Sequence, residues 1–219
     1  GVAGTTAVAV GSQIMHMLTV MIVGLAMGAT VNIGHAVGAG DRNKASLVIG
    51  NTATLFMAVS IPLTILLICL VKPVVMVMST PAEAVSGTAA YLTICFAGIP
   101  FITAYNVISS VFRGLGDSKS PMYFIAVACA ANIILDLVFM GVMDMGPAGA
   151  ALGTTLSQTI SVAVALIAIV KRRLISVSRS DFRPCREHIR RILNIGVPVA
   201  LQDGFIQIAF IVITIIANQ

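Results

Sequence analysis

The sequence predicts an all-α membrane protein, a bundle of apolar helices that crosses the bilayer several times. Hydrophobic residues make up 58% of its 219 residues, charged residues make up only 10%, and the mean hydropathy is +1.03. Soluble domains carry about 25% charged residues, so this composition excludes an ordinary soluble protein. The net charge of +5 comes from basic residues that flank apolar segments. We therefore expect the lipid bilayer as a partner and no nucleic acid.

Six segments are long and apolar enough to span the hydrocarbon core, which takes about 20 helical residues. They are residues 5–37, 45–71, 84–112, 122–143, 148–170 and 192–217. Pro62 and Pro100 lie inside the second and third segments. Proline removes a backbone hydrogen bond and bends a helix, so we expect a kink at each position.

Basic residues are concentrated in alternate connections between the spans, at 38–44, 113–121 and 171–191. These connections hold twelve of the 13 Lys and Arg residues, and the opposite side has only Lys72. The positive-inside rule places them in the cytoplasm of a multi-pass protein of the plasma membrane. Residue 1 is then extracytoplasmic. Since many membrane proteins begin in the cytoplasm, we expect an odd number of spans upstream.

The connection 171–191 is the longest and the most basic. Asp181 followed by Pro184 is typical of a helix start, and apolar residues recur at helical spacing from Ile189. We expect a short amphipathic helix on the cytoplasmic surface, leading into the last span. A solvated basic linker is the alternative interpretation.

Asp136 is the only charged residue between positions 120 and 143. An ionised carboxylate costs several kcal/mol in hydrocarbon, so such residues usually face a protein interior and serve ions or protons. Asn132 lies one helical turn earlier on the same face. Thr154 on the returning span is at a similar depth, roughly 10 Å below the outer end.

The oxygen atoms of Asn132, Asp136 and Thr154 suit a proton or a hard cation such as sodium, and no other metal is expected. Two structural alternatives remain open. Asp136 would serve a buried hydrogen-bond network, and the Thr154 hydroxyl would bond within its own helix.

A second carboxylate, Asp203, follows Gln202 in the last span, and Gln13 shares a face of the first span with His16. These four residues are candidates for a substrate cavity, with helix packing as the alternative. Two small-xxx-small patterns, Gly24 to Gly28 and Gly149 to Gly153, predict close helix packing.

Several motifs together resemble the multidrug and toxic compound extrusion (MATE) family. They are Gly-Ala-Gly-Asp at 38–41, Tyr91, Gly-Ile-Pro-Phe at 98–101, Arg-Gly-Leu-Gly-Asp-Ser-Lys-Ser-Pro at 113–121, Asn-Ile-Ile-Leu-Asp at 132–136, Gly-Ala-Ala-Leu-Gly-Thr at 149–154 and Gly-Val-Pro at 196–198. The resemblance implies twelve helices in two pseudo-symmetric lobes. Residues 1–172 would be the amino-terminal lobe without its first helix, 173–191 the linker and 192–219 the first helix of the second lobe.

The resemblance also implies a function: a monomeric, cation-coupled efflux antiporter for lipophilic, mostly cationic drugs, which works by alternating access. It would be no enzyme and would need no cofactor besides the coupling ion, H⁺ or Na⁺. Asn132, Asp136 and Thr154 match the family's amino-terminal cation site, whose partner Asp lies on the first helix. Residues 205–207 lack the Glu of the norfloxacin-exporter branch, so the chain is more similar to the DNA-damage-inducible F branch.

Two alternative functions stay open. A flippase for lipid-linked oligosaccharides belongs to the same superfamily, but its cavity would be lined with arginines, and the spans here have none. A membrane-embedded transferase would need clustered carboxylates to hold magnesium and pyrophosphate. No such cluster occurs in the sequence.

Overall fold

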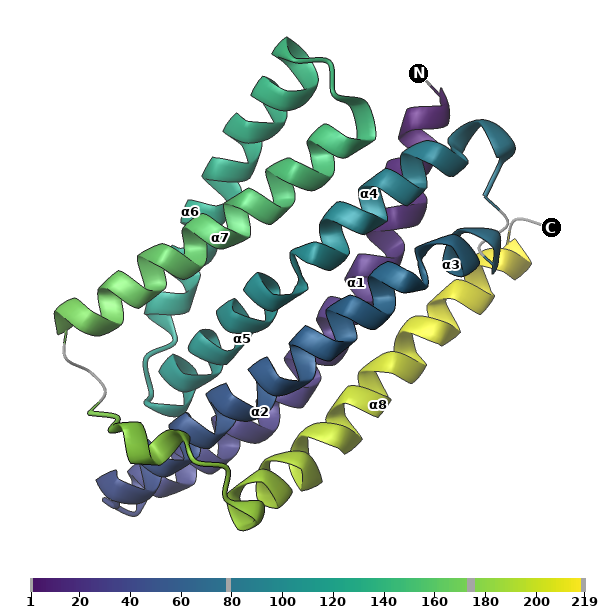
Figure 1. The fold of residues 1–219 in the computed structure, drawn as a ribbon. Helices are drawn as coiled ribbons and strands as arrows, with labels where there is room; N and C mark the ends of the chain where they lie inside the picture. Colours follow the sequence, from purple (N-terminus) through teal and green to yellow (C-terminus); the bar gives the residue numbers. More distant parts are fainter. Residues whose placement is uncertain (1, 78–79, 173–175, 218–219) are drawn as a thin grey trace.

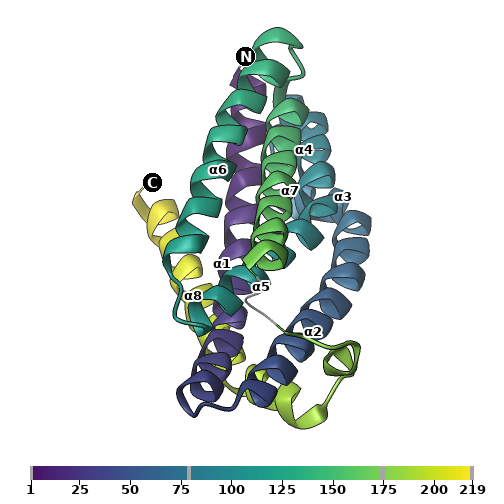
Figure 2. The same cartoon turned by 90° about the vertical axis from the view of Figure 1, so that its left-hand side faces the viewer.

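The computed structural model describes residues 2–77, 80–172 and 176–217, which form a bundle of long helices without any strand (Figures 1 and 2). Its elements are α1 Val2–Gly38, α2 Arg42–Cys69, α3 Val71–Val77, η1 Ala82–Ala84, α4 Val85–Ala97, α5 Ile99–Gly114, α6 Lys119–Asp136, η2 Leu137–Val142, α7 Gly146–Arg172, η3 Arg179–Phe182 and α8 Arg186–Ala217. The all-α prediction is confirmed.

Six membrane spans are consistent with the lengths of these helices. Five helices, α1, α2, α6 with η2, α7 and α8, are each long and apolar enough to cross the bilayer. The sixth span is the pair formed by α4 and α5, which meet at a bend of 44°. Gly98 lies at the break and Pro100 in the first turn of α5, so the kink predicted there is confirmed. Pro62, in contrast, lies within the unbroken helix α2.

The three basic connections lie at one end of the bundle, the lower end in Figure 2. The α1–α2 and α5–α6 connections are tight turns in which Gly40 and Gly116 have φ of 73° and 87°. Glycine reaches this left-handed region without steric cost and closes the preceding helix. Asp41 then accepts a hydrogen bond from the backbone N–H of Lys44 at 3.0 Å and caps α2. The shared end agrees with the predicted topology.

The connection 171–191 differs from the predicted surface helix. Among its described residues, Arg179–Phe182 form a single 3-10 turn, closed by a reciprocal capping box between Ser178 and Asp181. The helix that begins at Arg186 is α8 itself, which continues into the last span. The apolar periodicity from Ile189 onward therefore belongs to the spanning helix and not to a separate amphipathic one.

Side chains of α2 hold this linker against the bundle. Asn51 is fully buried; it accepts a 2.6 Å hydrogen bond from the backbone N–H of Cys185 and donates one of 3.3 Å to the carbonyl of Asp181. Thr54 donates a 2.8 Å hydrogen bond to the carbonyl of Phe182. Polar side chains of α2 thus form hydrogen bonds with backbone N–H and C=O groups of the linker that have no helical partner.

Helix α1 runs through the centre of the bundle and packs most extensively against α8 (Figure 1). Glycines make this approach close. A Cβ atom at Gly28 would collide with the carbonyl oxygen of Ile192, and one at Gly24 would lie 2.8 Å from the Cα of Ala200. Gly196 of α8 is equally tight against Leu25. The packing role predicted for the Gly24–Gly28 pattern is confirmed.

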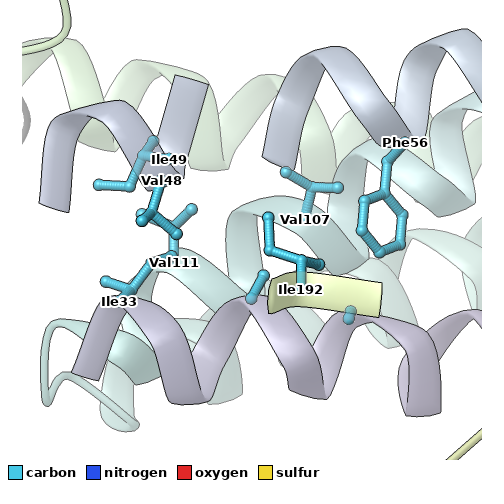
Figure 3. Close-up of a cluster of buried hydrophobic side chains, with 9 residues drawn as sticks. Ile33, Val48, Ile49, Phe56, Val107, Val111 and Ile192 are labelled. Carbon is cyan, nitrogen blue, oxygen red and sulfur yellow. The ribbon is translucent and has the colours of Figure 1, made fainter. Parts of the chain in front are cut away.

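The start of α8 belongs to the core of the preceding helices. Figure 3 shows Ile192, which is fully buried, among apolar side chains of three other helices. These neighbours are Ile33 of α1, Val48, Ile49 and Phe56 of α2, and Val107 and Val111 of α5. The first turns of α8 are therefore anchored by apolar packing, by close glycine contacts and by the docked linker.

Candidate cation site

Asp136 is the last residue of α6, where the backbone changes from an α-helix to a π-helix over Leu137–Val142. π-Helical turns are rare and occur frequently at functional sites. The chain then reverses into α7 through Asp144 and Gly146, whose φ values are 50° and 57°. The reversal places α7 directly beside α6, with the two helices antiparallel (Figure 2).

The carboxylate of Asp136 points at α7. Its Oδ1 atom occupies the space in which a side chain at Gly153 would begin. This oxygen is buried and has no hydrogen-bond partner among the described residues. The Gly149–Gly153 pattern thus allows close packing, as predicted, but at Gly153 the group that approaches the bare backbone is a carboxylate.

Asn132 and Thr154 line one cavity of about 140 Å³ between α5, α6 and α7. Its remaining lining residues are Tyr105, Ile125, Ala128, Cys129, Ser157 and Gln158. The amide nitrogen of Asn132 and the amide oxygen of Gln158 are both buried without a partner among the described residues. The cavity therefore presents both a free donor and a free acceptor.

Asp136 does not line this cavity, but its carboxylate touches Gly153, the residue before Thr154, so the three predicted residues lie on adjacent turns of α6 and α7. The Thr154 hydroxyl donates a 3.1 Å hydrogen bond to the carbonyl of Ala150 in its own helix. This back-bonding uses the hydroxyl proton and leaves oxygen lone pairs free for a ligand.

The four predicted substrate-cavity residues lie away from this site. Asp203 is half-buried on α8, with Oδ2 close to Gly24 of α1. His16 is 3.4 Å from the side-chain nitrogen of Gln207 on α8. Gln13 and Gln202 are exposed. Asp203 does not line the cavity that holds Asn132 and Thr154, so the two carboxylates belong to separate regions.

A larger cavity of about 360 Å³ lies between α1, α2, α5 and α8, and its wall is almost entirely apolar. Ser60 and Thr103 are its only polar lining residues, and the Ser60 hydroxyl is bonded to Met57. None of the four predicted substrate-cavity residues lines it. The cavity suits apolar ligand groups and offers few partners for water.

Sequence reasoning missed Gln158 and Tyr105. Gln158 lies one helical turn after Thr154, so the same spacing argument that links Asn132 to Asp136 would have placed it on the site face. Tyr105 had no comparable signal, because the bend between α4 and α5 determines which face of α5 reaches α6 and α7.

Comparison with known proteins gives a consistent result. The family model MatE matches residues 1–138. The probable multidrug resistance protein YpnP of Bacillus subtilis (strain 168) is 42% identical over 125 residues, which are 57% of this chain and 28% of that protein. The probable multidrug resistance protein NorM of Thermotoga maritima is 27% identical over 200 residues, which cover 90% of this chain and 43% of that protein.

Solved structures agree with the fold. An inward-facing multidrug resistance MATE family transporter of the MOP superfamily superposes with a TM-score of 0.89 at 26% identity, over 95% of this chain and 48% of that one. An outward-facing structure of such a transporter gives a TM-score of 0.86 at 26% identity, over 94% and 46%. The chain thus spans less than half the length of these relatives.

Proposed function

Since the chain belongs to the MatE family of multidrug transporters, we propose that it forms part of a cation-coupled antiporter that exports small molecules from the cell. The observation that carries this proposal is the half-buried Asp136, whose Oδ1 is buried against Gly153 of α7, next to Thr154 in sequence and one turn from Asn132. A transporter driven by an ion gradient needs such a site, where an ion binds reversibly within the membrane.

Binding of the coupling ion, H⁺ or Na⁺, neutralises Asp136 and removes the cost of a buried charge. The neutral and ionised sites prefer different packing of α6 against α7, since the carboxylate contacts the backbone at Gly153 directly. Ion binding from the outer side favours release of the substrate, and loss of the ion to the cytoplasm resets the site. The likeness to both inward- and outward-facing transporters supports alternating access.

The substrates we propose are lipophilic and mostly cationic small molecules. Relatives are named as multidrug resistance proteins, and the apolar cavity between α1, α2, α5 and α8 suits lipophilic groups. The basic ends of the helices support insertion in the plasma membrane with the connections 38–44, 113–121 and 171–191 in the cytoplasm.

The experiment is Asp136→Asn in the complete protein, assayed as drug efflux from proteoliposomes under an imposed proton or sodium gradient. We expect efflux to lose its dependence on both gradients, because Asn keeps the shape but binds no proton or cation by charge. Asp144→Asn is the matched control, since Asp144 is exposed and Asn tolerates its positive φ. Gradient-driven efflux at the wild-type rate in the Asp136 variant would refute the proposal.

A further inference from the structure

Buried polar atoms without partners are not scattered through the described residues; most of them lie along one path. Eight buried side-chain N or O atoms lack a hydrogen-bond partner there. Five of them belong to α5, α6 and α7: Ser109, Arg113, Asn132, Asp136 and Gln158. Native proteins leave few such groups unpaired, and unpaired ones usually contact water or an ion.

The path begins at the cytoplasmic end of α5. Tyr105, Ser109 and Arg113 follow one another at intervals of four residues, so they share one face of the helix. Ser109 therefore lies one helical turn from Tyr105 on one side and from Arg113 on the other. The Tyr105 hydroxyl donates a 3.2 Å hydrogen bond to the carbonyl of Pro121, at the cytoplasmic start of α6.

Tyr105 joins this face to the cation site. It lines the 140 Å³ cavity together with Cys129, Asn132 and Gln158. Such a volume admits several water molecules, each of which occupies roughly 10–15 Å³ by this kind of measure. From Asn132 the next turn of α6 carries Asp136. Polar groups at one-turn intervals thus lie on both sides of this cavity, toward Arg113 on α5 and toward Asp136 on α6.

We propose that this polar column is a water-filled route by which the coupling proton leaves Asp136 for the cytoplasm, separate from the substrate path. The inference rests on the proposed function, in which Asp136 takes up and releases a cation. The proton passes from the Asp136 carboxyl to water held by Asn132 and Gln158, and then along water beside Tyr105 and Ser109 to the cytoplasm. The carboxylate remains behind, ionised.

Arg113 places a positive charge at the cytoplasmic end of the route. A fixed guanidinium charge at the mouth of a narrow polar passage opposes the entry of cations from the cytoplasm. The other titratable groups on the route are Tyr105 and Cys129, and neither adds a positive charge to it. This barrier applies to a proton moving in either direction, so Arg113 limits proton leak, and the gradient sets the direction of net flux.

The main test uses Gln158→Leu in the complete protein, reconstituted in vesicles with a pH-sensitive dye. We expect drug-driven proton flux to fall roughly tenfold, the loss expected from one hydrogen bond in the relay. Thr159→Val is the control, since the Thr159 hydroxyl bonds within its own helix at 2.9 Å and does not line the cavity. Arg113→Gln is expected to raise proton leak in the absence of drug.

A second measurement does not depend on transport. In a background without native cysteines, Ser109→Cys should react with a small water-soluble thiol reagent, whereas Ile108→Cys should not, although Ile108 is the slightly more exposed of these two buried neighbours. Equal reactivity of the two would overturn the route, as would wild-type proton flux in Gln158→Leu. If Asp136→Asn abolishes gradient-driven efflux and either of these two results is also found, the proposed cation site stands and only the route is refuted.

Discussion

The carboxylate of Asp136 lies directly against the bare backbone of Gly153, on the neighbouring antiparallel helix. No side chain larger than hydrogen fits between them. The residue at position 153 therefore limits where this carboxylate lies, although it has no functional group of its own. This contact links the carboxylate on which the proposed function depends to a glycine that a packing motif alone would explain.

Gly153→Ala is expected to uncouple transport. The added methyl group would collide with Oδ1 of Asp136. Because this atom is the end of a side chain, the carboxylate can rotate away at a modest cost in stability. A displacement of about 1 Å at a reacting group reduces rates by as much as ~100-fold. Gradient-driven efflux should fall on this scale, while the protein still folds. In Gly34→Ala the new Cβ lies 3.7 Å from its nearest neighbour, so efflux should be unchanged; equal losses in both variants would contradict the interpretation.

Gly28→Ala is expected to destabilise the contact between α1 and α8. Its Cβ would meet the backbone of Ile192 and Gly196, which cannot move without separating the helices. Overpacking of this kind costs about 1–3 kcal/mol. A lower melting temperature of the purified protein in detergent would show it, again with Gly34→Ala as the control. An unchanged melting temperature would mean that the two helices separate freely.

Asn51→Leu is expected to release the linker from α2. The substitution removes one hydrogen bond to the N–H of Cys185 and one to the carbonyl of Asp181. Leaving such buried backbone groups unsatisfied costs about 1–3 kcal/mol. Limited trypsin digestion should then cleave faster after Arg179 and Arg186, which are followed by Ser180 and Glu187. Thr93→Val is the control, because the exposed Thr93 hydroxyl is hydrogen-bonded within α4 at 2.7 Å, and it should leave the cleavage rate unchanged. Equal cleavage rates in the two variants would contradict the role of Asn51 in holding the linker.

Asp117→Ala is expected to weaken the start of α6. One carboxylate oxygen accepts hydrogen bonds from the backbone N–H groups of Lys119 and Ser120, at 3.1 and 3.0 Å, and the other accepts from the Ser120 hydroxyl at 2.6 Å. Loss of such a cap costs about 1 kcal/mol. The melting temperature of Asp117→Ala should fall. That of Asp117→Asn should fall less, because Asn keeps one acceptor oxygen. An equal drop in the two variants would show that charge and not capping matters.

The sequence predicted the spans and the neighbouring positions of the proposed site residues with few errors. Apolar length and the Lys and Arg pattern set the six spans, and helical spacing with depth brought Asn132, Asp136 and Thr154 together. The separate helix expected in 171–191 was wrong, because the same apolar periodicity serves equally for a surface helix and for the first turns of α8. The role of Asp203 stays open, as its depth alone could not show that it faces α1.

Hydropathy, charge asymmetry and helical period are local properties, so the sequence by itself determined which segments are long and apolar enough to cross the membrane, which connections are basic and which span carries Asp136. Which helices touch is decided by shape over long sequence distances, and only the tertiary structure shows it. The bend at Gly98 turns Tyr105 toward Gln158, and the glycines of α1 admit α8 instead of another helix. The polar residues that the proposed proton route brings together from α5, α6 and α7 form no recognisable pattern in the sequence of any one helix.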